Sequence, residues 1–165
     1  STGNLAVHLE KLEAGVSVVQ IVGEFEDKLN AADLTLLIQK PETPVYVMAD
    51  GRHFWRVIDN LMNNICKYAQ PGTRVYVDLR ELIFRNTSRY PLNISSEELM
   101  ERFVRGDESR NTEGSGLGIS IAKSLMELMG GSFMLYVDGD LFKVVLGFAQ
   151  MEEEKEPLDE DKSGK

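Results

Sequence analysis

The chain reads Asn111-Thr-Glu-Gly114-Ser-Gly116-Leu-Gly118-Ile-Ser-Ile-Ala-Lys123 where three glycines at alternate positions run directly into an apolar-periodic segment. This segment keeps apolar residues at helical spacing as far as Leu128 and then meets two glycines, so it predicts a helix. Glycines let backbone N–H groups approach an anion closely, and the N–H groups of a helix's first turn have no partners within the helix. The stretch therefore predicts a phosphate-binding loop at a helix N-terminus, although a glycine cluster before a helix is also typical of an ordinary loop.

A second stretch has the pattern of an amphipathic helix with an unusual polar edge. It reads Phe54-Trp-Arg-Val-Ile-Asp-Asn60-Leu-Met-Asn-Asn64-Ile-Cys-Lys67-Tyr68-Ala69, and its apolar residues recur at helical spacing. Asp50 is a suitable N-cap for this helix, and Pro71-Gly72 ends it. Asn60, Asn64 and Lys67 lie four and three residues apart, so they share one edge of the helix.

The polar edge indicates a chemistry. Asparagine is a poor helix former because its amide competes for backbone hydrogen bonds, so two on one edge need a reason. An amide oxygen can bind Mg²⁺, which usually keeps several waters and also contacts substrate phosphates. Lys67, one turn further on, would add a point charge for those phosphates. For either asparagine taken alone, a solvated polar face is the simpler interpretation.

Together the two stretches resemble the ATP-binding domain of sensor histidine kinases, in the superfamily shared with gyrase, heat-shock chaperone and mismatch-repair ATPases. The family's N box, Asn-x-x-x-Asn-x-x-Lys-Tyr, is matched by Asn60, Asn64, Lys67 and Tyr68. Its Gly-x-Gly-x-Gly box is matched by the three glycines, and its F box by Glu101-Arg-Phe103-Val-Arg105. The order and spacing of these motifs fit, and the resemblance covers roughly residues 5–148.

The resemblance implies ATP and Mg²⁺ as cofactors and a role for each matched residue. Asn60 and Asn64 would hold Mg²⁺, and Tyr68 would line the nucleotide pocket. Catalysis would rest on Asn60, Lys67 and Arg105, with Arg102 as a further neutralising group. The phosphates would meet the glycine box, which consists of Gly114, Ser115, Gly116, Leu117 and Gly118.

Two positions depart from the family pattern. The family's Asp-x-Gly-x-Gly box places an Asp on the adenine amino group, and this chain has Asn86 there and no glycines. Asn86 can still accept through its carbonyl oxygen, with a weaker hydrogen bond because it carries no charge. Where the ATPase relatives have a Glu that activates water, this chain has Arg56, which cannot act as a general base. The second departure argues against simple ATP hydrolysis and for transfer to another acceptor.

Composition fits one domain with a real core over residues 1–150, followed by an acidic tail over residues 151–165 that is too polar to fold. The net charge of −9 and the absence of a basic stripe make nucleic acid an improbable partner. No apolar run is long enough to span a membrane, and the single Cys66 excludes an internal disulfide. We expect a cytoplasmic domain, and the resemblance implies that it belongs to a membrane-anchored sensor protein.

The element pattern predicts an α/β two-layer sandwich, in which a mixed, mostly antiparallel sheet packs on helices in the Bergerat-type arrangement. Strands are expected at residues 5–9, 34–39, 45–48, 73–79, 82–86, 132–137 and 141–148, and a first helix at residues 16–31. Residues 95–112, with one short helix at 97–104, have the composition of a lid. No turn residue separates Arg80 from Leu82, so the hairpin there is tight and irregular, or residues are missing near Glu81, the alternative that we favour.

The resulting hypothesis is a domain that binds Mg-ATP and transfers its γ-phosphoryl group to a histidine on a separate dimerisation domain, with a response regulator downstream. His8 and His53 lie in a predicted strand and a predicted helix start, so we interpret both as structural. Two alternatives stay open. One is a nucleotide-binding pseudokinase or sensor module, and the other is a serine kinase or anti-sigma factor of the same superfamily.

Overall fold

A computed structural model describes residues 6–109 and 117–149 of the chain. The first half runs β1 (Glu10–Glu13), α1 (Ala14–Gly23), α2 (Glu26–Ala31), β2 (Thr35–Gln39), β3 (Tyr46–Ala49) and α3 (Gly51–Tyr68). The second half runs β4 (Arg74–Asp78), β5 (Ile83–Thr87), α4 (Ser96–Ser109), α5 (Leu117–Leu128), β6 (Ser132–Asp138) and β7 (Leu141–Gly147). Among these helices, none combines the length and apolarity that a membrane crossing needs.

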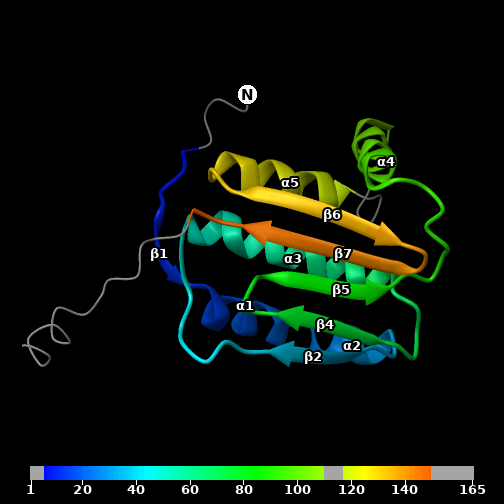
Figure 1. Cartoon of the computed structure of the whole chain (residues 1–165), viewed down its shortest axis with the longest axis horizontal. Coiled ribbons are helices and arrows are strands. Elements are labelled where there is room, and N and C mark those ends of the chain that lie inside the picture. The colour runs from blue at the N-terminus through cyan, green and yellow to red at the C-terminus, as the bar shows by residue number, and fades with distance from the viewer. Residues whose placement is uncertain (1–5, 110–116, 150–165) are drawn as a thin grey trace, which may run out of the picture.

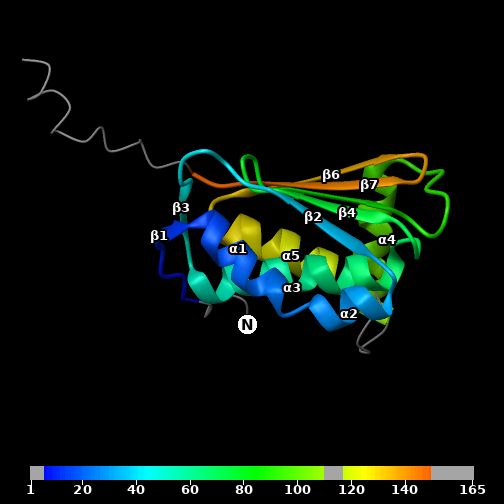
Figure 2. The same cartoon turned by 90° about the horizontal axis from the view of Figure 1, so that it is seen from below.

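The elements form two layers, a five-stranded sheet and a layer of helices (Figures 1 and 2). The strand order is β2-β4-β5-β7-β6, in which β2 and β4 are parallel and every other neighbouring pair is antiparallel. β1 and β3 form a separate antiparallel pair. The predicted two-layer sandwich with a mixed, mostly antiparallel sheet is therefore confirmed.

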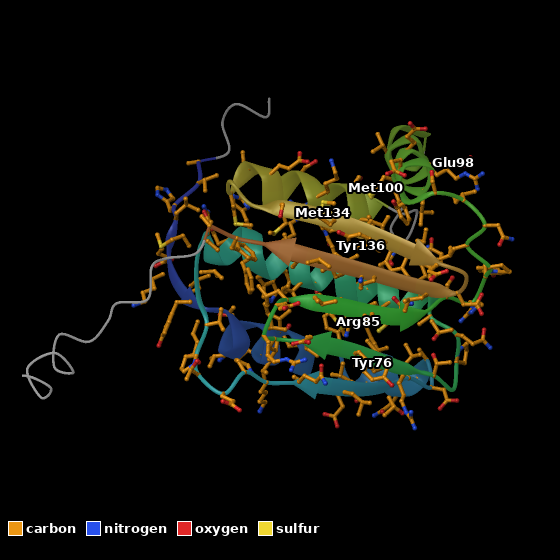
Figure 3. The ribbon with its side chains drawn as sticks, viewed as in Figure 1. Tyr76, Arg85, Glu98, Met100, Met134 and Tyr136 are labelled. Atoms are coloured by element: carbon orange, nitrogen blue, oxygen red, sulfur yellow. The ribbon has the colours of Figure 1, made fainter. Side chains whose placement is uncertain are left out.

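The core fills the space between the layers. Alternate strand residues such as Val75, Phe84 and Val144 point inward and are buried, because side chains along a strand alternate between its two faces. α3 supplies the opposite wall through a continuous apolar stripe. The stripe consists of Phe54, Val57, Ile58, Leu61, Met62 and Ile65, all buried. The other face of the sheet carries Tyr76, Arg85, Met134 and Tyr136 (Figure 3).

The N-terminal third differs from the sequence prediction in two places. The predicted strand at residues 5–9 is wrong for the described residues 6–9, which form no strand, and β1 begins only at Glu10. The expected single helix at residues 16–31 is two helices that separate at Glu24 and Phe25. Its predicted buried face is nevertheless correct, because Val18, Val22, Phe25 and Leu29 all lie in the core.

Two further segments have a different extent from the one predicted. β4 and β5 are joined by a four-residue turn in which Leu82 takes a φ of 54°. The hairpin is therefore tight and irregular, which is the alternative that we favoured less than missing residues near Glu81. α4 extends to Ser109 rather than residue 104, and Ser95 caps it through a 3.1 Å hydrogen bond from the Glu98 N–H. Leu99, Met100 and Phe103 pack against the core, so α4 is anchored along its inner side.

Asp50 fixes the start of α3, as predicted. Its carboxylate accepts hydrogen bonds from the N–H of Arg52 (3.0 Å) and from the N–H of His8 (2.9 Å), which lies 42 residues earlier in the chain. The His8 hydrogen bond is the largest cause that lowers the Asp50 pKa, from 3.8 to about 2, against the opposing effect of burial. The ionised carboxylate therefore stabilises the fold above about pH 4, and this stability is lost as the pH falls toward 2.

This linkage gives a prediction for Asp50→Asn, which keeps a capping oxygen and removes the charge. We expect the variant to be less stable than the parent at pH 7, by about 1 kcal/mol or more. The difference should shrink as the pH is lowered from 4 toward 2, because the parent then loses the same charge. Urea unfolding at several pH values measures it, and a difference that stays constant with pH would contradict the assignment.

Candidate nucleotide-binding site

One pocket of about 190 Å³ is lined by residues of α3, β5, α4 and β7 and of the segment that follows β5. α3 contributes Asn64 and Tyr68, β5 contributes Asn86, and α4 contributes Leu99 and Phe103. The remaining lining residues are Ser88, Tyr90, Leu92 and Phe142. A larger groove of about 350 Å³ lies between α1 and the segment that follows β2, and none of the predicted site residues lines it.

Asn86 is the buried polar group of this pocket. Its side chain is only 4% exposed, because Asn86 alternates with Arg85 along β5 and faces the helical layer. Its Oδ1 atom has no hydrogen-bond partner within the described residues. Burying an unpaired carbonyl oxygen costs free energy, so this atom is poised to accept a hydrogen bond from a ligand.

The loop after β5 is tied down on both sides and forms one wall of the pocket. The N–H of Arg89 donates to the carbonyl oxygen of Tyr68 (2.8 Å), at the end of α3. The N–H of Leu92 donates to the carbonyl oxygen of Gly139 (3.1 Å), in the turn between β6 and β7. Ser88, Tyr90 and Leu92 are therefore held beside Asn86, and the pocket is a preformed feature of the fold.

The two motifs found in the sequence meet at the start of α5. A Cβ atom added to Gly118 would lie 3.4 Å from the Cβ of Asn60 and 3.5 Å from its carbonyl oxygen. These are ordinary van der Waals distances, so α5 and α3 pack closely at this point and a side chain much longer than a methyl group would have to be accommodated by Asn60. The Nδ2 atom of Asn60 is buried and has no hydrogen-bond partner within the described residues.

The other predicted residues of α3 lie near the pocket in different ways. Tyr68 lines it, and Lys67 is exposed with its Nζ 5.1 Å from the centroid of the Tyr68 ring. Asn63 is excluded from the pocket by its own contacts: its Oδ1 accepts from Lys28 (3.1 Å) and its Nδ2 donates to Asp59 (3.2 Å). Of the α3 asparagines, Asn64 therefore lines the pocket, Asn63 has a structural role, and Asn60 lies outside the lining, against Gly118.

One predicted site residue lies outside the pocket lining, and several others lie outside the residues that the structure describes. Arg102 forms an ion pair with Glu98 (3.5 Å) on the exposed side of α4 and is not among the lining residues. Gly114, Ser115 and Gly116 lie outside the described residues, as do the side chains of Arg105 and Leu117. Their roles remain predictions.

Several lining residues were not predicted as site residues. Ser88, Tyr90 and Leu92 follow Asn86 at alternate positions, and this period of two was a usable signal. Phe142 pairs with Asn86 in the sheet, and Leu99 reaches the pocket from α4. Phe142 and Leu99 depend on how distant segments pack, so no local pattern marks them.

Residues 49–156 match the family model described as histidine kinase-, DNA gyrase B-, and HSP90-like ATPase. The chain belongs to this family. The match covers α3, the pocket and α5, so the predicted ATP-binding domain of the histidine kinase type is confirmed. The match agrees with the pocket geometry, because α3, which carries the N box, and Asn86, at the position of the family's adenine-binding Asp, line one cavity.

Sensor kinases are among the known proteins of similar sequence. The sensor histidine kinase HprS of Escherichia coli (strain K12) is 30% identical over 139 residues, which cover 78% of this chain and 29% of HprS. The chain thus spans less than a third of the length of this relative.

Solved structures share the fold. The catalytic domain of histidine kinase ThkA superposes with a TM-score of 0.71 at 17% identity, covering 87% of this chain and 96% of that domain. Full-length ShkA, solved in complex with AMPPNP, superposes with a TM-score of 0.64 at 16% identity, covering 89% of this chain and 33% of ShkA.

Proposed function

We propose that this domain binds Mg-ATP in the Asn86 pocket and delivers the γ-phosphoryl group to a histidine on a separate dimerisation domain of the same sensor kinase. The observation that carries the proposal is the convergence of Asn64, Tyr68 and Asn86 on one preformed pocket. The contact between Asn60 and Gly118 adds the start of α5 to the same region. The relative HprS is named a sensor histidine kinase, which supports phosphoryl transfer to histidine as the activity.

The base and the phosphates would occupy different ends of this region. The base would enter the pocket, where Tyr68 and Phe103 offer aromatic surface and Asn86 an unpaired acceptor. The phosphates would reach the start of α5, since backbone N–H groups at a helix N-terminus favour negative charge. Lys67 is exposed near the pocket and would offset part of the charge on the phosphates.

The residues of α3 fit a magnesium ion that is shared with a nucleotide. Among the described residues, no group of three His, Cys, Asp or Glu side chains could hold a metal by itself. Mg²⁺ does not need such a group, because it commonly binds one or two protein oxygens together with waters and phosphates. Asn60 and Asn64, one turn apart, would supply those oxygens. The unpaired Nδ2 of Asn60 is a donor, so it would bond an oxygen of the phosphates or of a water and not the metal itself. When bound, Mg²⁺ would reduce the charge on the phosphates.

Transfer to an external acceptor, rather than hydrolysis, follows from the side chains present. Where the ATPase relatives have a Glu that activates water, one turn before Asn60, this chain has the exposed Arg56, and a guanidinium cannot act as a general base. The chain would therefore position ATP and reduce its charge, while the incoming imidazole acts as the nucleophile.

Calorimetric titration of the chain with ATP tests nucleotide binding. We expect binding in the presence of Mg²⁺ and affinity at least about tenfold weaker in EDTA, because the phosphates then lose their bridge to α3. Equal affinity in the two conditions would remove the metal from the proposal, and no binding in either would remove the nucleotide.

The full-length protein tests the transfer itself. Incubation with labelled ATP should give a label that is lost in acid and kept in base, which is the behaviour of phosphohistidine. An acid-stable label would favour the serine-kinase alternative, and binding without any label would favour the pseudokinase. A response regulator as the next acceptor, and a membrane anchor elsewhere in the protein, complete the proposal for the whole kinase.

A further inference from the structure

We propose that the Asn86 pocket accepts 6-oxopurine nucleoside triphosphates as well as ATP. This inference rests on the proposed function, since it requires that the base of the nucleotide enters the pocket with its six-position at Asn86. It concerns which nucleotides can serve as the donor, which neither the family match nor the phosphotransfer mechanism decides.

The group at the six-position differs between purines in its hydrogen-bonding sense. Adenine carries an amino group there, which donates, and 6-oxopurines carry a carbonyl oxygen, which only accepts. A pocket selects between them when the facing side chain can act in one sense only, because the wrong base then leaves two like groups facing each other in a buried place.

Asn86 is not restricted in this way. Its amide presents an acceptor, Oδ1, and a donor, Nδ2, and a half-turn of the terminal torsion exchanges their positions. Because Oδ1 has no hydrogen-bond partner within the described residues, no bond to this atom holds the amide in one orientation. The side chain can accept from a 6-amino group in one orientation and donate to a 6-oxo group in the other.

The surroundings do not restore the selection. The other residues that line the pocket are aromatic, aliphatic, hydroxyl or amide side chains, and none of them is a carboxylate, a lysine or an arginine. The Ser88 hydroxyl, which accepts from the Tyr90 N–H (3.2 Å), can itself donate or accept. Electrostatic repulsion of a 6-oxo group is therefore absent from this lining.

The test compares Mg-ATP with Mg-ITP, since inosine carries the 6-oxo group without the 2-amino group of guanine. Calorimetric titration of the unmodified chain should give two affinities within about tenfold of each other, the span of one neutral hydrogen bond. A preference for ATP greater than this overturns the inference. This arm needs no variant, so it stands even if a substitution prevents folding.

Asn86→Asp supplies the second arm, because a carboxylate only accepts. We expect the ATP-to-ITP affinity ratio to rise by at least about tenfold, as the 6-oxo group then meets a charged acceptor. An unchanged ratio in a folded variant overturns the inference. Arg85→Ala is the matched control: this neighbour on β5 lies on the open face of the sheet (Figure 3), and its loss should leave both affinities unchanged. A shift of the ratio in Arg85→Ala would overturn the assignment to the Asn86 amide.

The two levels of the proposal fail in different ways. If neither nucleotide binds in Mg²⁺, the proposed function fails together with this inference. If ATP binds normally and ITP binds more than about tenfold more weakly, only the inference fails.

Discussion

Incubated alone with Mg-ATP, this chain is expected to form no phosphohistidine. Its two histidines lie at the wrong end of the molecule for transfer. His53 is in the first turn of α3, and its Nε2 lies 3.9 Å from the buried Asp50 carboxylate. Asn60, which contacts the start of α5 where the phosphates would lie, is seven residues further along the same helix, about 10 Å away along the helix axis.

His8 is held at the same end. Its backbone N–H donates to Asp50 (2.9 Å), which anchors this segment beside the start of α3. Because α3 is rigid, His53 in its first turn stays at a fixed distance from the residues in the middle of the helix. The segment that holds His8 could approach those residues only if its hydrogen bond to Asp50 broke. We therefore expect neither imidazole to attack a γ-phosphoryl group held between Asn60 and the start of α5.

Joining the chain to a helical domain that carries an acceptor histidine should restore transfer. Linking the two parts makes the encounter intramolecular, and we expect labelling to rise by at least about 100-fold over the two parts mixed at micromolar concentration. Labelled ATP with acid and base stability of the product measures it. The matched controls are His8→Ala and His53→Ala in the joined protein, which should keep the label. An acid-labile label on the chain alone that disappears in either variant would contradict the prediction.

The middle of the molecule could be predicted from sequence because local and tertiary signals agree there. α3 has an uninterrupted apolar stripe, a capping aspartate and a proline-glycine stop, and each of these acts within a few residues. Short-range signals also mark α5 and the β6–β7 hairpin, in which Gly139 takes a φ of 58°. Where these short-range rules point to one structure, the sequence is enough to place the element.

The errors occur where a distant residue decides. The segment at residues 6–9 alternates like a strand, yet the N–H of His8 bonds to Asp50, which lies 42 residues away in sequence. The break between α1 and α2 leaves the apolar face continuous through Phe25, so periodicity does not detect it. The turn at Leu82 takes a backbone conformation that favours glycine, and no local residue announces it.

The candidate site divides in the same way. Asn64, Tyr68 and Asn86 could be proposed from motif spacing, and all three line one pocket. Arg102 was proposed from the F box, yet it pairs with Glu98 outside the lining. Motif spacing locates the segment that approaches the ligand, and the side of the helix that faces it depends on packing.

The strongest test of the metal hypothesis uses two neighbouring asparagines of α3. Asn64→Ala removes a pocket amide, whereas Asn63→Ala removes one that bonds to Lys28 and Asp59. In Mg²⁺ we expect Asn64→Ala to weaken ATP binding by about 10- to 100-fold, the loss associated with one contact to a charged group. Asn63→Ala should change the affinity by less than about twofold, because its contacts support the packing of α2 on α3 and not the pocket.

Metal dependence separates ligation from simple packing. If the Asn64 amide binds Mg²⁺, the loss in Asn64→Ala should largely disappear when both proteins are titrated in EDTA, since the parent then also lacks the bridge. An equal loss with and without Mg²⁺ would place Asn64 against the nucleotide itself. Equal effects of Asn63→Ala and Asn64→Ala would mean that both act through the stability of α3. Because the two residues are adjacent on one helix, helix propensity and chain position are matched, and only the direction of the side chain differs.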